Sequence, residues 1–414
     1  MGIVSIGNLE EGMVLKDDVY APNGRFILGQ GTVLRAKYIK MFKIWGVNEA
    51  DINGVDDQEI ILKRVVEEEK QQRAELEVRS YFPEEDLWTP EMRELFDLRV
   101  SRESTLLDFP SEYEKEYGKK TEVVILDFDN LSLSRPSLQE LLTSQVRLFS
   151  LPDIYFKIRD VLNSPVSSAI HIAKVVGTDP SLTVRLLRLV NSSFYGFPSP
   201  IQSVSRAVAI VGTNELTTLA LAISTMSVFK HIPADLVDMK SFWKHSIMCG
   251  IFSRLLAYMK RVPSEERFFL AGLLHDIGRV VLYTKLPQHM TFAIREARAK
   301  KIPLLETERK YLGFDHADLG RMLLQQWNIP EPIRVLVGSH HRPLEAENIE
   351  EASIICVADV LANAVRLGTS GNFVVPAPSH DVWEQLELSQ GSLESILVQG
   401  ERQIAEIMKI FLVA

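Results

Sequence analysis

The stretch of sequence that decides the fold is Leu270-Ala271-Gly272-Leu273-Leu274-His275-Asp276-Ile277-Gly278. An apolar run here leads directly into a histidine, an aspartate and a glycine. The apolar residues on both sides recur at helical spacing, so we expect a helix over residues 265–284. His275 and Asp276 are therefore two ionisable side chains placed within an apolar helical segment.

Other ionisable side chains are set in apolar or helical sequence in the same way. They are His245, His316, the pair His340-His341, and Asp359. A buried carboxylate is costly unless something neutralises or hydrogen-bonds it, and for Asp359 either a divalent cation or a histidine would serve. Imidazole and carboxylate ligands together suit iron, manganese or zinc rather than calcium.

The sequence around these segments reads as one helix after another from about residue 145. Asp179 followed by Pro180 is a typical helix start, with the aspartate as N-cap and the proline in the first turn. Further helical patterns cover residues 214–229, 240–260, 265–284, 288–300, 316–327, 331–339, 350–367 and 392–412. The pattern predicts a mainly α protein.

The order of these blocks resembles the HDOD family (HD-related output domain), a branch of the HD superfamily of metal-dependent phosphohydrolases. The matching blocks are Leu151-Pro152, residues 179–183 and 185–188, Asn191-Ser192-Ser193-Phe194-Tyr195-Gly196, residues 201–205 and 207–212, residues 271–278, Asp315-His316-Ala317, Trp327-Asn328-Ile329-Pro330 and His340-His341. The resemblance covers about residues 145–365 and implies an all-helical HD/HDOD-type domain.

The resemblance also implies a metal site, because the His-Asp pair anchors a divalent metal in the HD superfamily. The candidate ligands in this chain are His245, His275, Asp276, His316, His340 and Asp359. The metal would be iron, manganese or zinc. From the residues alone two alternatives stay open: His275 and Asp276 could instead form a structural hydrogen-bonded pair, and Asp315 could place His316 simply as the start of a helix. At most one of His340 and His341 need face a metal.

Two features depart from the active HD-GYP enzymes. His340-His341 is followed by Arg342-Pro343-Leu344-Glu345 without a Gly-Tyr-Pro signature, and Arg279 stands where those enzymes commonly have lysine. An arginine can hold a phosphate but cannot transfer a proton near neutral pH. Arg279 and His341 are therefore candidate ligand-binding residues, and we assign no catalytic residue.

Two functions follow from the resemblance. HDOD domains are regarded as regulatory relatives of HD hydrolases, so the first is a bacterial signal-transduction protein whose HDOD domain binds a protein partner or a small phosphorylated ligand without catalysis. The alternative is a metal-dependent phosphohydrolase or phosphodiesterase acting on a nucleotide or cyclic dinucleotide. The metal would then lower the pKa of a bound water and polarise a phosphoryl oxygen.

Residues 1–55 read as a small β-rich module that resembles the one often preceding HD-GYP domains. Asn23-Gly24 lies between candidate strands at Met13–Tyr20 and Arg25–Leu28, which is a strong hairpin signal. A helix follows over Ala36–Trp45 and a last strand over Val47–Ile52.

Residues 56–144 form a charged helix followed by a poorly defined segment with a candidate strand at Thr121–Asp127. The helix has only a narrow apolar seam, so it is either a solvated connector or a coiled-coil contact in a homodimer. Asp127 and Asp129 are interpreted as a strand-end turn. We place the HDOD domain at 145–367, and a loop and C-terminal helical tail at 368–414.

Bulk composition narrows the partners. The 414 residues are 46% hydrophobic and 24% charged, with a formal charge of −9. No global basic field is available for nucleic acid or anionic lipid, so we expect neither as a partner. We see no signal peptide or membrane span and expect a cytoplasmic protein. Cys249 and Cys356 are interpreted as buried structural thiols.

Overall fold

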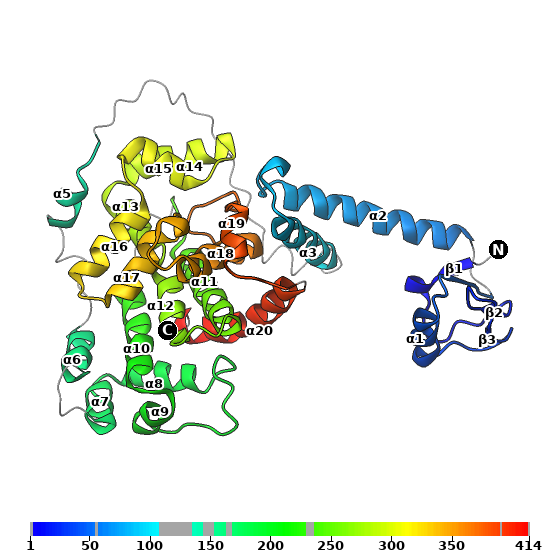
Figure 1. Cartoon of the computed structure of the whole chain (residues 1–414), viewed down its shortest axis with the longest axis horizontal. Helices are drawn as coiled ribbons and strands as arrows, with labels where there is room; N and C mark the ends of the chain where they lie inside the picture. The colour runs from blue at the N-terminus through cyan, green and yellow to red at the C-terminus, as the bar shows by residue number, and fades with distance from the viewer. Residues whose placement is uncertain are drawn as a thin grey trace. The chain divides into compact units, whose positions relative to one another are not determined.

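The structure is a computed structural model that describes residues 3–53, 57–106, 135–143, 153–162, 168–228, 236–389 and 391–412. It contains two compact units, Met1–Leu76 and Glu77–Ala414. The chain is mainly α, as the sequence predicts, and its short strands lie near the N-terminus (Figure 1). The predicted strand at 121–127, with Asp127 and Asp129, falls outside the described residues.

The first unit is built from two small antiparallel sheets and one helix. Its elements are β1 (Ile3–Ser5), the 3-10 turn η1 (Ile6–Asn8), β2 (Val19–Tyr20), β3 (Phe26–Leu28), α1 (Ala36–Ile44) and β4 (Glu49–Asp51), and the charged helix α2 (Asp57–Arg79) follows them. Strand β1 pairs with β4, and β2 pairs with β3. The predicted hairpin is confirmed, since Gly24 has a φ of +80° and its N–H donates to the Ala21 carbonyl at 2.8 Å.

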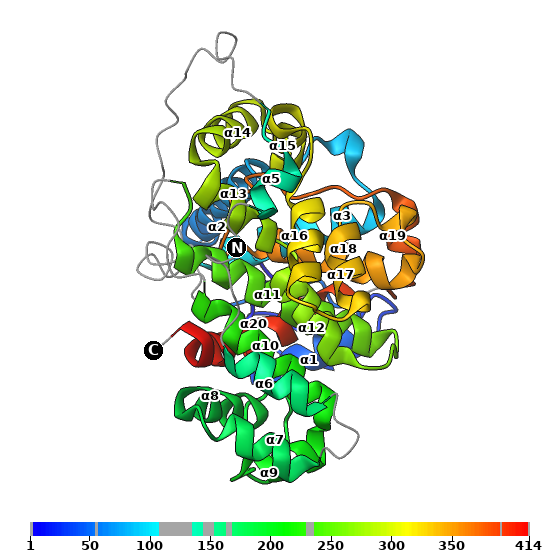
Figure 2. The ribbon, with the colours of Figure 1, turned by 90° about the vertical axis from the view of Figure 1, so that its left-hand side faces the viewer.

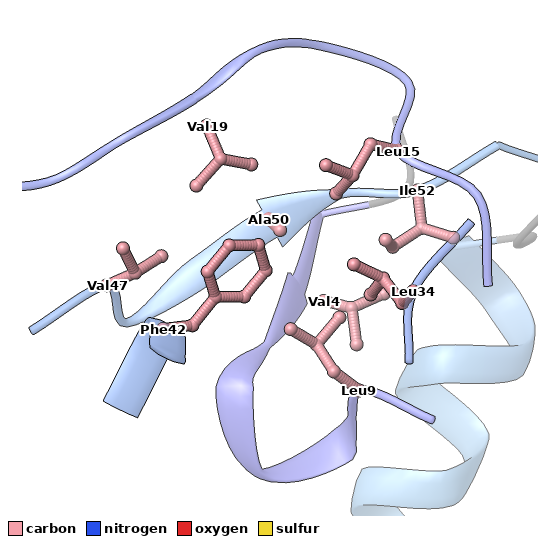
Figure 3. Packing of buried hydrophobic residues seen from close by; sticks show 9 residues of the cluster. All are labelled: Val4, Leu9, Leu15, Val19, Leu34, Phe42, Val47, Ala50 and Ile52. Carbon is pink, nitrogen blue, oxygen red and sulfur yellow. The ribbon is translucent and has the colours of Figure 1, made fainter. Parts of the chain in front are cut away.

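The predicted strand Met13–Tyr20 is shorter than expected. Val14 bridges to Val33, Leu15 bridges to Ile52, and only Val19 and Tyr20 belong to a named strand. Successive residues of this segment pair with different parts of the chain, so the segment does not form one continuous strand ladder. Figure 3 shows the apolar core that these pairings enclose, in which Leu15 and Phe42 are fully buried.

The second unit is helical. After α2 come η2 (Glu85–Leu87), α3 (Pro90–Leu106), α5 (Leu138–Thr143), α6 (Asp153–Leu162), α7 (Ala169–Val176), α8 (Pro180–Val190), α9 (Val204–Val211), α10 (Thr213–Val228), α11 (Met239–Met259), α12 (Glu265–Leu274), α13 (Ile277–Lys285), α14 (Pro287–Lys300), α15 (Leu304–Leu312), α16 (His316–Gln326), α17 (Glu331–Ser339), η4 (Pro343–Glu345), α18 (Ile349–Val365), α19 (His380–Glu384) and α20 (Ser392–Leu412).

Helix α11 is the centre of this unit. It packs against α12, α18 and α20, while α16 packs against α13 and α17. Helices α6 to α9 lie together at one end of the unit in both views (Figures 1 and 2). The predicted helix start at Asp179 and Pro180 is confirmed, because Asp179 caps α8, and the helix buries Leu182, Leu186 and Leu189.

The predicted helix 265–284 is two helices, and the break falls at His275 and Asp276. Asp276 is the N-cap of α13, with φ −95° and ψ 9°, which are not helical values. Gly278 lets α13 approach α16 very closely, since a Cβ there would lie 2.0 Å from the His316 carbonyl oxygen. This packing turns the chain at the His-Asp pair, a contact that local periodicity does not reveal.

Within the described residues, no single helix is long and apolar enough to cross a membrane, although the bent pair Val204–Val211 and Thr213–Ser224 passes such a test when taken together.

Candidate metal centre

Four buried side chains meet between α11, the α12–α13 junction and α18. His245 comes from α11, His275 and Asp276 from the junction, and Asp359 from α18. The Asp359 Oδ1 atom lies 3.1 Å from His245 Nε2 and 3.3 Å from His275 Nε2. Asp276 Oδ2 lies 3.1 Å from His275 Nε2 and 3.5 Å from His245 Nε2. We call this group the first cluster.

The rings of two histidines are oriented by backbone carbonyls. His275 Nδ1 donates to the Gly272 carbonyl, and His340 Nδ1 donates to the Val337 carbonyl, both at 2.7 Å. A carbonyl oxygen only accepts, so the proton of each neutral ring must sit on Nδ1. The Nε2 atom of each neutral ring is then the one that can bind a metal, which is the arrangement found in metal-ligating histidines. Burial opposes a charge on His275, but Asp276 raises the pKa of His275 well above its ordinary value, so its Nε2 must lose a proton before a metal binds.

A second cluster contains three histidines from α16 and the end of α17. His316 Nε2 lies 3.3 Å from His340 Nε2 and 2.9 Å from His341 Nε2. Both His340 and His341 therefore reach His316, whereas the sequence suggested that at most one of them need face a metal. His340 is the C-cap of α17 and His341 follows it, so the two rings lie at the end of the helix, where both reach His316.

Asp276 joins the two clusters. Its Oδ2 belongs to the first cluster, while its Oδ1 lies 2.9 Å from His316 Nε2 in the second. One carboxylate thus reaches both groups of imidazoles. All the candidate ligands predicted from the sequence, together with His341, lie in this one arrangement.

The centre is buried and contains more carboxylates than permanently charged basic groups. Asp276, Asp359 and Glu308 supply three carboxylates, and Arg279 is the one guanidinium among the described residues that pairs with any of them, contacting Asp276 and Glu308. Burial by itself would raise the pKa values of Asp276 and Asp359, but neighbouring cationic groups and hydrogen bonds hold both well below the usual range. Two further positive charges are needed to balance this centre, from protonated histidines or from a bound cation.

The histidines divide into two electrostatic classes. Burial works against a charged His316, as does Arg279, but Glu308 and Asp276 outweigh them and raise the pKa of His316 to about 9. Burial, reinforced by the charges of His275 and His316, lowers the pKa of His340 to about 3. Burial also lowers the pKa of His341. His340 and His341 are therefore neutral donors at physiological pH.

Glu308 on α15 is a functional side chain that the sequence analysis missed. It accepts from the backbone N–H of His316 at 3.1 Å and also contacts His316 Nδ1. Its Oε1 accepts from Arg279 Nε at 2.9 Å. One sequence signal could have found it. Glu308 lies four residues after Leu304 and four residues before Leu312, so a helix there places its carboxylate on the same face as these two leucines.

Arg279 faces inward. Its Nη1 donates to Asp276 Oδ2 at 3.0 Å and to Ser370 Oγ at 2.7 Å, and its side chain is only 4% exposed. Two of its donor nitrogens therefore hold the bridging carboxylate, Glu308 and the loop after α18. Asp315, as expected, caps α16, but this does not keep His316 out of the site.

A pocket of about 390 Å³ lies beside the second cluster. Its lining includes His341, Arg279 and Arg342 together with the thiol residue Cys356. The remaining lining is largely apolar and comes from Pro303, Leu305, Pro343, Leu344, Pro376, Ala377, Pro378 and Val382, with Glu345, Asn372 and Ser379. A small molecule in this pocket would contact a residue of the metal-competent cluster. Cys249 and Cys356 are both buried and free, as expected.

The donor set fits a transition metal. Two imidazole lone pairs that face each other at 3.3 Å repel unless a proton or a cation lies between them, and such contacts occur in both clusters. Nitrogen and carboxylate donors suit iron, manganese and zinc. His245 Nδ1 has no hydrogen-bond partner among the described residues, so its ring is held mainly by what its Nε2 faces.

Comparison with known proteins identifies the helical part of the chain. Residues 148–343 match the family model of the HDOD domain. This part of the chain is an HDOD domain. The match contains His245, His275, Asp276, His316 and His340, and it ends before Asp359.

Solved structures support the fold. An HDOD domain protein of unknown function from Geobacter sulfurreducens has a TM-score of 0.52 and 22% identity, covering 66% of this chain and 100% of that one. A protein from Shewanella amazonensis SB2B, provisionally named a phosphohydrolase, has a TM-score of 0.53 and 23% identity, covering 66% and 98%. A protein from Marinobacter aquaeolei VT8, provisionally named a signal transduction protein, has a TM-score of 0.51 and 22% identity, covering 69% and 68%. These likenesses establish the fold alone.

Among curated proteins, an uncharacterized protein of Treponema pallidum (strain Nichols) is 28% identical over 198 residues. The match covers 46% of this chain and 37% of that protein's length.

Proposed function

We propose that the HDOD domain is a metal-dependent ligand-binding module of a bacterial signalling protein. It would hold divalent transition-metal ions in the two clusters and a small phosphorylated ligand in the adjoining pocket. The observation that carries this proposal is the position of Asp276, whose two oxygens face different imidazole groups. The chain would work in the cytoplasm and pass its signal to a protein partner or a second copy.

The roles of individual residues follow from their contacts. His245, His275 and Asp359 would hold an ion in the first cluster, and His316, His340 and His341 would hold one in the second. Arg279 and Glu308 would orient Asp276 and His316, because each is hydrogen-bonded to one of these side chains. The ions would supply charge for binding a phosphate group and would polarise its oxygens.

The pocket limits the kind of ligand. Its volume of about 390 Å³ fits a small molecule, and its apolar prolines and leucines suit a flat or hydrophobic group. Arg342 is part of the lining, although it also pairs with Asp318 at 2.6 Å. A phosphate ester could place its phosphate toward His341 and Arg342 and its remaining group against the prolines and leucines of the pocket.

A second candidate function is hydrolysis of that phosphate ester. The bridging Asp276 beside an accessible pocket favours it, since paired metal ions clamp the attacking and leaving oxygens in many phosphatases. Against it, Arg279 cannot act as a proton donor or acceptor near neutral pH, and Glu308 is tied to His316 and Arg279.

The two functions are separated by measuring binding and turnover on the same metal-loaded protein. Nucleoside monophosphates, cyclic dinucleotides and a generic phosphodiester would be tested for binding by calorimetry and for product formation by chromatography. The binding module predicts saturable, metal-dependent binding without turnover. The control variant is Asp153→Asn, because Asp153 is an exposed residue of α6. Turnover that is lost in His275→Ala and kept in Asp153→Asn would show that the domain is a hydrolase and not only a binding module.

A further inference from the structure

The first unit exposes four large apolar side chains that do not belong to its core. On the hairpin, Tyr20 and Phe26 are 53% and 54% exposed. At the end of α1, Ile44 and Trp45 are 79% and 38% exposed. The core in Figure 3 is formed by other residues. Single exposed apolar residues are normal on a protein surface, whereas a group of them that lies together marks an interaction surface.

The turn of the hairpin brings these side chains together. Tyr20 and Phe26 pair across the two strands, and their ring centres are 5.7 Å apart. Arg25 precedes Phe26 in the chain, and its Cζ atom lies 4.5 Å from the centre of the Trp45 ring. The turn and the end of α1 therefore form one edge of the unit. We call it the aromatic edge, and it consists of Tyr20, Arg25, Phe26, Ile44 and Trp45.

Cations surround the aromatic edge. Helix α1 has a lysine at positions 37, 40 and 43 and no acidic residue. Lys40 lies four residues before Ile44, so the two share one side of the helix, and Lys43 next to them is exposed. Within the described part of this unit, Arg25, Lys40 and Lys43 take part in no ion pair, whereas Lys16 does. These three cations are available to an anionic partner.

The chemistry of the edge favours a lipid surface over a nucleic acid. Aromatic rings and cations together suit either partner, because bases stack on rings and cations contact phosphates in both. The most exposed side chain of the edge, however, is the aliphatic Ile44, which offers no ring for stacking. Hydrocarbon covers such a side chain, while aromatic rings lie at the level of the lipid headgroups.

We propose that the aromatic edge of the first unit binds the surface of a bilayer that contains anionic lipids. Its apolar side chains lie at the level of the headgroups, and Arg25, Lys40 and Lys43 face lipid phosphates. This contact needs no helix that crosses the bilayer. The formal charge of −9 belongs to the whole chain and predicted no membrane partner, whereas the local arrangement at this edge favours one. The proposal does not depend on the metal centre.

The test is flotation of the full, chelator-treated chain with vesicles made of equal parts phosphatidylcholine and phosphatidylglycerol, or of phosphatidylcholine alone. Phe26→Ser and Ile44→Ser should each weaken binding to the anionic vesicles about tenfold, because each removes a side chain that the bilayer buries. Arg25→Gln and Lys43→Gln should each weaken it about fivefold. Binding should also fall as salt is added and should be much weaker to phosphatidylcholine alone.

The matched controls lie in the second unit. Ile170→Ser on α7 removes an isoleucine that is 71% exposed, and Arg402→Gln on α20 removes an exposed charge. Both should bind the anionic vesicles as the natural chain does, and all variants should unfold at its temperature because the replaced side chains are exposed. Failure of the natural chain to float with anionic vesicles, or equal binding by the edge variants, would overturn the proposal. A natural chain that does not float but forms a dimer in analytical ultracentrifugation, which Ile44→Ser dissociates, would assign the edge to a second copy instead.

Discussion

Asp276 Oδ1 lies 2.9 Å from His316 Nε2, while the other oxygen of the same carboxylate faces the histidines of α11 and α12. This relationship exists because the chain breaks between α12 and α13 and because Gly278 lets α16 approach closely. A single side chain therefore connects two groups of ligands that come from five helices or their ends.

Glu308→Gln should weaken metal binding at the second cluster. The glutamate orients His316 through its Nδ1 and makes the ring a better donor, and loss of such support commonly costs 10- to 100-fold in affinity. Competition with a chromophoric chelator would measure the change. Glu306→Gln is the control, because Glu306 lies on the same helix but is exposed. Equal metal affinity in both variants would show that Glu308 does not support the site.

Metal affinity should rise with pH up to about 9. In the metal-free chain His316 has a pKa of about 9, so at pH 7 its Nε2 carries a proton that must leave before a metal can bind. Raising the pH removes this competing proton, and the affinity should increase by at most about tenfold per pH unit below 9. Calorimetry in buffers of different ionisation enthalpy would count the protons released. Binding without proton release would contradict this protonation state of His316.

The same pKa predicts how pH affects the stability of the metal-free protein. The folded pKa of His316 is raised above the ordinary value of 6.5, so its stabilisation is complete below pH 6.5 and is lost as pH rises through about 9. Urea unfolding of chelator-treated protein should give a lower free energy of unfolding at pH 9.5 than at pH 6.5. In His316→Gln the difference between the free energies of unfolding at the two pH values should be smaller. An equally large difference in that variant would show that His316 does not cause it.

Gly278→Ala should be strongly destabilising. The added Cβ would lie 2.0 Å from the backbone oxygen of His316, so α13 and α16 would have to separate, at a cost of more than about 3 kcal/mol. Gly320→Ala adds the same methyl group on the facing helix, but its nearest contact is a Val337 methyl at 3.3 Å. We expect that variant to cost much less in thermal unfolding. Similar losses in both would mean that the close approach at Gly278 is unimportant.

Much of the fold follows from sequence pattern. The exceptions depend on contacts between residues that are far apart in the sequence. The runs around α11 and α18 are long and apolar, and these two helices appear where the pattern predicts them. The break at His275 and Asp276 was not predicted, because it depends on the contact of Gly278 with α16 and not on neighbouring residues. Strand Met13–Tyr20 was predicted too long because its residues pair with several partners.

The candidate site shows the same division. Histidines and aspartates in apolar sequence stood out individually, and the structure brings them together. Helix α15 was not predicted, and with it Glu308 was missed, because its polar residues outnumber its apolar ones and the helix is stabilised by packing against α14. Ser370 lies in a loop with no periodic pattern, so its contact with Arg279 could not be inferred.

The most direct test of the central claim is the transition-metal content of the full chain purified without chelator, measured by mass spectrometry of the elements alongside titration with Fe²⁺, Mn²⁺ and Zn²⁺. The arrangement around Asp276 predicts about two ions per chain, with loss of tight binding in both clusters in Asp276→Asn and no loss in Asp153→Asn. A folded chain that contains none of these metals and takes up none in titration would contradict it.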